Sequence, residues 1–152
     1  MPALPSARQL NRFFLLSWLI AVVQVAGLQG ARQFTEAAVA GWTLAATASY
    51  AFIYLLPALL LTHLLRRMLA FRTMRSAPAV LAAAAVGLTG LTQVLLFADR
   101  LIHDMYGFHI NGFVIDLVLT PGGIAALGAG PGTRIAAGLV VLAFFAAQAG
   151  AY

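Results

Sequence analysis

Four long apolar segments dominate the chain. They cover residues 13–28, 42–65, 78–98 and 135–152, and each is close to the roughly 17–25 residues that an α-helix needs to cross a bilayer. Lipid offers no partner to an unpaired backbone amide, so a spanning segment has to be a helix or part of a closed barrel. Runs such as "VLAAAAVGL" at 80–88 lack the alternation of barrel strands. The pattern predicts an all-α integral membrane domain, residues 1–152, with four transmembrane helices.

Composition supports the same class. Of the 152 residues, 62% are hydrophobic and only 9% are charged, whereas a soluble domain has about a quarter of its residues charged. The mean hydropathy is +0.95. The chain contains no cysteine, which excludes disulfides, thiolate metal sites and thiol nucleophiles.

The arginines predict the orientation of the helices. One set of connections carries six arginines and no acidic residue, and the opposite set carries three arginines against four carboxylates. The positive-inside rule places the arginine-rich side, with both termini, in the cytoplasm. The net charge of +5 is therefore a topology signal and a contact for anionic lipid, and it does not indicate a nucleic-acid partner. The six arginines are Arg8, Arg12, Arg66, Arg67, Arg72 and Arg75.

The first apolar segment also resembles a signal peptide, because a basic start precedes it. Its apolar run is long for a signal peptide, and the small-residue pattern in "VAGLQGA" is a weak cleavage site. We therefore expect an uncleaved first span, with cleavage as the alternative.

The polar stretch "LFADRLIHDMYGFHINGFVIDLVLTPGG", residues 96–123, differs from the rest of the chain. It opens the predicted outer connection, residues 99–134, and long connections tend to be functional or disordered. Its many apolar and aromatic residues argue against disorder. We expect the third span to continue as a helix to Tyr106 and to break at Gly107. A second, amphipathic helix over 108–119 should follow, lying flat at the interface or dipping into the membrane.

This stretch holds the candidate chemistry. On a helix, Asp99 and His103 share one face, and Tyr106 follows three residues later. Arg100 and Asp104 form a second pair with the same spacing. Three interpretations remain open: a metal or acid–base site, a polar collar, and a contact for lipid headgroups or a partner domain. The metal or acid–base site would use Asp99, His103, Asp104 and His109, whereas in the collar Asp99, Arg100 and Asp104 would satisfy one another. The spacing D-x₃-H-D-x₄-H matches no specific ligand motif, so we assign no metal, cofactor or catalytic residue.

A few residues inside the spans predict how the helices pack. Pro57 should kink the second span. Gly87 and Gly90 should form a small-residue face for close helix packing. Gln93 should hydrogen-bond to a neighbouring helix, and Ser17 should bond back to its own helix.

The segment "LLFADRLIHDMYGFHINGFVIDLVLTPGG" resembles the periplasmic connection in the membrane domain of PbgA/YejM-like inner-membrane proteins and related bacterial sulfatase-family proteins. In that pattern the third span ends in an acidic residue, here Asp99. An aromatic residue, a Phe-His-Ile-Asn sequence, an apolar helix and a proline turn follow. The matching residues are Tyr106, Phe108, His109, Ile110, Asn111, Phe113, Val114, Leu117 and Pro121.

The resemblance implies a function. Members of this family have five spans followed by a periplasmic domain of the alkaline-phosphatase/sulfatase superfold, and PbgA-type proteins are linked to lipopolysaccharide and envelope lipid homeostasis. We expect this chain to be a truncated four-span version in the bacterial inner membrane. It would be a non-enzymatic anchor and docking domain, with membrane lipids and the missing sulfatase-like domain as partners. Lipid or domain docking would use Asp99, Arg100, His103, Tyr106, Phe108, His109 and Asn111.

The alternative function is a stand-alone small transporter or lipid-binding protein. It would use Gln93, Asp99 and His103 in a cavity, because ionisable groups inside a membrane usually mark a functional path. The ionisable residues gather at the predicted interface and not at mid-span, which favours the anchor.

Overall fold

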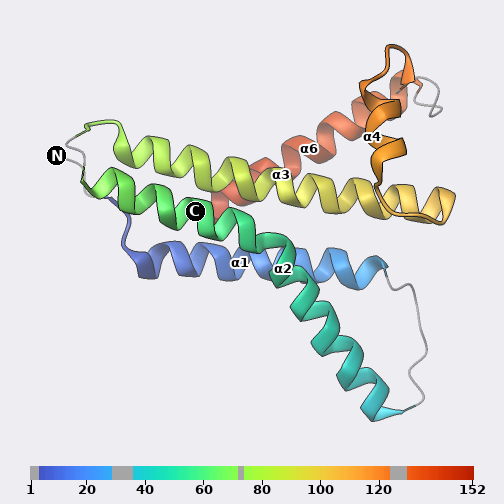
Figure 1. Cartoon of the computed structure of the whole chain (residues 1–152), viewed down its shortest axis with the longest axis horizontal. Coiled ribbons are helices and arrows are strands. Elements are labelled where there is room, and N and C mark those ends of the chain that lie inside the picture. The colour runs from blue at the N-terminus through green and yellow to red at the C-terminus, as the bar shows by residue number, and fades with distance from the viewer. Residues whose placement is uncertain (1–3, 29–35, 72–73, 124–129) are drawn as a thin grey trace.

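The computed structural model describes residues 4–28, 36–71, 74–123 and 130–152. Over these residues the chain forms five α-helices and no strand. Four of the five are long and apolar enough to cross a membrane, as the sequence predicts. Figure 1 shows their arrangement. The helices are α1 (Ala7–Leu28), α2 (Ala37–Ala70), α3 (Ala77–Tyr106), α4 (Gly112–Leu119) and α6 (Pro131–Ala151).

The long helices extend beyond the apolar segments that predict them. α1 begins before residue 13, and α6 begins before residue 135. α2 has 34 residues, or about 51 Å at 1.5 Å per residue, against about 30 Å of hydrocarbon. Hydropathy marks only the part of a helix that lies in hydrocarbon. The backbone hydrogen bonds of a helix continue through polar residues, so α3 runs on through Asp99 to Tyr106, as predicted.

The core lies between α1, α2 and α3. Small residues such as Ala21, Ala51 and Ala85 are fully buried there and let the helices approach closely. In the first turn of α1, Leu10 packs with Leu69 of α2. Polar bonds add to this packing: the indole N–H of Trp18 donates to the Ala48 carbonyl of α2 at 2.9 Å.

α2 bends in its middle, and its N-terminal part diverges from the other helices (Figure 1). Pro57 lies inside this helix, which agrees with the predicted kink. Proline has no N–H to donate to the carbonyl four residues earlier, and its ring clashes with that carbonyl, so the helix axis turns there. Beyond the bend, Trp42 and Leu44 are largely exposed. The bend therefore separates the start of α2 from α3.

α6 packs on α3 at the edge of the bundle. The ring of Phe145 lies over Gly90, and Phe97 lies near Phe144 with ring centroids 5.8 Å apart. At its end, Tyr152 meets Phe13 of α1 at 5.4 Å between ring centroids. Gly90 thus forms the close contact that the sequence predicts, whereas a side chain at Gly87 would meet no atom within 4 Å.

Large apolar side chains cover the outside of the bundle. Val23 on α1, Leu44 on α2 and Leu139 on α6 are 71%, 70% and 62% exposed. Exposed apolar surface on this scale is rare in soluble monomers. An apolar surface of this kind is suited to contact with lipid.

The contact at Gly90 predicts a specific effect on stability. In Gly90→Ala, the new methyl group would lie 2.7 Å from the Phe145 ring, so the helices must separate or the ring must move. We expect a loss of about 1–3 kcal/mol in the free energy of unfolding, measured by denaturant titration in micelles. Gly87→Ala is the matched control and should be neutral. Equal stability of the two variants would contradict the contact.

Candidate functional site

Asp99, near the end of α3, holds the chain segment that follows that helix. Its Oδ2 lies 2.8 Å from Nδ1 of His109, and its Oδ1 accepts a hydrogen bond from the backbone N–H of Ile110 at 2.6 Å. The Asp99 side chain is 14% exposed, whereas His109 is 62% exposed. Hydrogen bonds to a carboxylate are among the stronger ones in proteins. One carboxylate therefore ties both the backbone and a side chain of the returning segment to α3.

Gly107 makes this return possible. It adopts a left-handed conformation with φ 75°, which a residue with a Cβ rarely takes, and its N–H donates to the His103 carbonyl. Residues 108–111 are not helical, and α4 then starts after Asn111. The Asn111 side chain caps α4 by accepting from the Val114 N–H at 3.2 Å. The predicted break and short helix are confirmed, with α4 shorter than the predicted 108–119.

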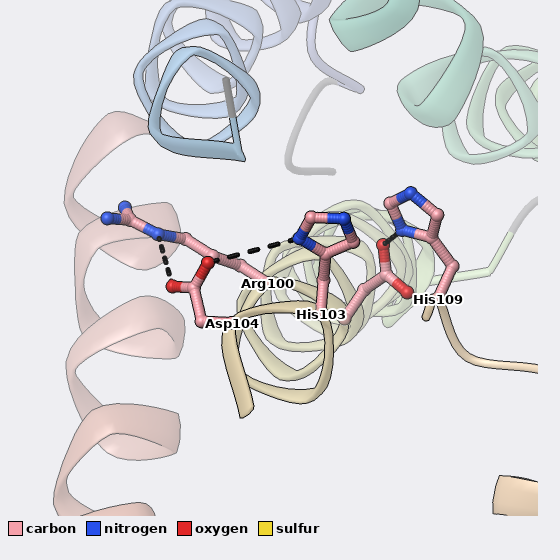
Figure 2. A network of polar contacts seen from close by, with 5 residues as sticks. Arg100, His103, Asp104 and His109 are labelled. Atoms are coloured by element: carbon pink, nitrogen blue, oxygen red, sulfur yellow. Dashed lines mark hydrogen bonds and ion pairs between the residues drawn. The ribbon is translucent and has the colours of Figure 1, made fainter. Parts of the chain in front are cut away.

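Arg100 and Asp104 form the predicted ion pair, with Nε 3.7 Å from Oδ2. Both side chains are about half exposed, so the pair adds little to stability. The Arg100 guanidinium fills the space beside Gly27, where any side chain would collide with it. Figure 2 shows Arg100 pointing away from His109. Arg100 thus joins the end of α3 to the end of α1.

The two imidazoles stack on each other. His103 and His109 have ring centroids 4.7 Å apart, and Nδ1 of His103 lies 4.0 Å from Oδ1 of Asp104 (Figure 2). The predicted collar is therefore only half right. Asp104 pairs with Arg100, but Asp99 pairs with His109, because the turn at Gly107 brings that ring back to α3.

The metal site that we considered from the sequence does not assemble. Within the described ranges, no three His, Cys, Asp or Glu side chains are grouped as a metal ion requires. The pair formed by Asp99 and His109 is instead a carboxylate that orients an imidazole, with the ring held through Nδ1.

Residues 99–119, which we call the outer shelf, present a mixed polar and aromatic surface. Tyr106 and Phe108 stack with ring centroids 5.7 Å apart, and both are exposed. α4 runs across the end of α3 (Figure 1). Val114 is its one buried side chain, and its other apolar residues are mostly exposed, as in a helix lying in a membrane interface. All seven predicted docking residues belong to the shelf: Asp99, Arg100, His103, Tyr106, Phe108, His109 and Asn111.

A groove of about 480 Å³ lies between α2 and α3, with its polar end at the shelf. Asp99 and His109 line it, but Gln93 and His103 do not. Of the three residues that the transporter alternative places in a cavity, Gln93, Asp99 and His103, Asp99 lines this groove. The lining residues are Tyr54, Pro57, Thr92, Leu95, Leu96, Asp99, His109 and Ile110.

Buried polar side chains also link three helices. Gln93 of α3 donates to the Ser17 carbonyl of α1 at 2.8 Å and accepts from Gln24. Ser17 donates to its own helix at Phe13, as predicted, and also lies 2.6 Å from Oε1 of Gln148 on α6. The predictions from the sequence did not include Gln24 and Gln148. An amide inside an apolar run was the available signal, since such a group in lipid needs a partner.

The hold of Asp99 on Ile110 can be tested by hydrogen exchange. In Asp99→Ala, the amide of Ile110 loses a bond to a charged group, worth about 1.5–3 kcal/mol. We expect its exchange to accelerate roughly tenfold to a hundredfold, measured by mass spectrometry on protein in nanodiscs. Asp104→Ala removes a carboxylate farther along α3 and should leave that amide unchanged. Equal exchange in both variants would show that Asp99 does not hold the segment.

Comparisons with known proteins found no matching family model, no matching curated protein and no matching solved structure.

Proposed function

We propose that the chain is the membrane anchor of a sulfatase-like envelope protein and that its outer shelf is the docking surface for a water-exposed domain. The proposal rests on the two hydrogen bonds of the Asp99 carboxylate, one to the His109 ring and one to the backbone N–H of Ile110. A connection between two spans would otherwise be free to move. Fixing it before a partner arrives lowers the entropy lost on docking.

The chemistry of the shelf suits a protein partner. Its exposed surface combines an arginine, Arg100, with the aromatic pair Tyr106 and Phe108. Arginine and aromatic residues are enriched where proteins bind one another. The sulfatase-like nature of the partner is inferred from the resemblance of residues 99–121 to PbgA/YejM-like proteins.

The proposal includes a location and an orientation. The arginines at the start of α1, at the end of α2 and before α3 would face the cytoplasm of a bacterium, and the shelf would face the periplasm. In that setting the domain would serve lipopolysaccharide or other envelope lipid homeostasis from the inner membrane.

The orientation can be tested because the chain has no native cysteine. Met105→Cys lies on the shelf and Met74→Cys lies before α3, and both methionines are exposed. We expect a membrane-impermeant maleimide to label position 105 in intact spheroplasts and position 74 only after permeabilisation. The reverse pattern would overturn the orientation.

Docking can be tested with a photo-crosslinking amino acid at position 106 in native membranes. We expect a protein adduct that contains a sulfatase-like domain, and the Asp99→Ala background should reduce it several-fold. Position 71, also exposed and at the other end of the bundle, is the control and should give no such adduct. Adducts of lipid alone, or of proteins without that domain, would overturn the proposal.

A further inference from the structure

Docking of a partner domain on the shelf does not account for the groove between α2 and α3. Pro57, where α2 bends, is one of the residues that line it between the two helices. Its volume of about 480 Å³ lies within the roughly 300–1,000 Å³ of small-ligand sites. A cavity on the lipid-facing side of a bundle is reached most directly from the bilayer.

The groove is apolar at one end and polar at the other. Leu95, Leu96 and Pro57 form apolar walls, and Asp99 and His109 lie where the groove meets the shelf. Along α3, the distance from Thr92 to Asp99 is about 10 Å at 1.5 Å per residue, against about 15 Å for the hydrocarbon of one leaflet. With the helices in the membrane and the shelf at its surface, as proposed above, the groove would follow about two thirds of one leaflet and end at the headgroups.

The polar end offers hydrogen-bond acceptors and no fixed positive charge among the residues that the structure describes. Nδ1 of His109 lies 2.8 Å from Oδ2 of Asp99, so Nε2 is the ring nitrogen left for a headgroup. The described lining contains one carboxylate and no arginine. Arg100, which follows Asp99 in the chain, is directed to Gly27 of α1. A headgroup that donates hydrogen bonds and carries a positive charge complements this end, whereas a purely anionic headgroup does not.

We propose that this groove binds one acyl chain of a phosphatidylethanolamine-type lipid, with the ammonium group of the lipid beside Asp99 and His109. The chain would lie along Leu95 and Leu96, and the headgroup would reach the shelf. Such a lipid would fill the space that the bend of α2 opens. The groove shares Asp99 and His109 with the shelf, whereas the docking residues Tyr106 and Phe108 do not line it.

The test uses two matched leucines of α3. Leu95 lines the groove, while Leu91, one turn earlier, does not, and their exposed fractions are 51% and 52%. Leu95→Trp should fill the groove and lower binding of phosphatidylethanolamine roughly tenfold, measured by native mass spectrometry in mixed micelles. Leu91→Trp should bind like the wild type. Equal binding by the two variants would overturn the site.

The headgroup is tested with lipids that have identical acyl chains. Wild-type protein should retain phosphatidylethanolamine severalfold better than phosphatidylglycerol, and Asp99→Asn should reduce that preference. Equal retention of the two lipids by the wild-type protein would overturn the assignment of the headgroup.

A measurement on the wild-type chain covers the case in which Leu95→Trp does not fold. Phosphatidylethanolamine with a photoreactive acyl chain should form adducts on peptides that contain Tyr54 and Leu95. Adducts confined to the exposed face of α6 would overturn the groove. Crosslinking of a sulfatase-like partner at position 106 should be the same in Leu95→Trp, so the two proposals can fail separately.

Discussion

A bilayer offers no hydrogen-bond partner to a buried polar group, and the four helices that are long and apolar enough to cross one have to meet that constraint there. It requires the spans to be helices, and it requires each amide side chain within them to find a partner on another helix. Gln93 meets this requirement most fully, because it donates to Ser17 and accepts from Gln24. The same links keep α1 and α3 in register. The hydrophobic effect cannot do so, because lipid tails are as apolar as the helix surfaces.

α6 is positioned by contacts with α3 and α1 although most of its surface is exposed. These contacts are the bond of Gln148 to Ser17, the packing of Phe145 over Gly90, and the ring pairs of Phe97 with Phe144 and of Phe13 with Tyr152. They are short-range and directional. A helix held in this way has a defined position although it buries little surface.

Asp99 connects the two proposed roles of the molecule. Its carboxylate holds the shelf through His109 and Ile110, and the same group lies at the polar end of the groove. A lipid headgroup bound there would sit next to the surface where a partner domain docks.

The sequence alone determined the all-helical class, the four long apolar helices, the continuation of α3 to Tyr106, the break at Gly107 and the short helix that follows. These features depend on local hydropathy and on the backbone preferences of single residues. Only the tertiary structure decided that Asp99 pairs with His109 and not with a neighbour on its own helix. It also decided that Gln24 and Gln148 join the network of Gln93, and that the bend at Pro57 opens a groove. Such contacts depend on the angles at which separate helices cross and on where the segment after Gly107 returns to α3. The order of residues along the chain does not specify either.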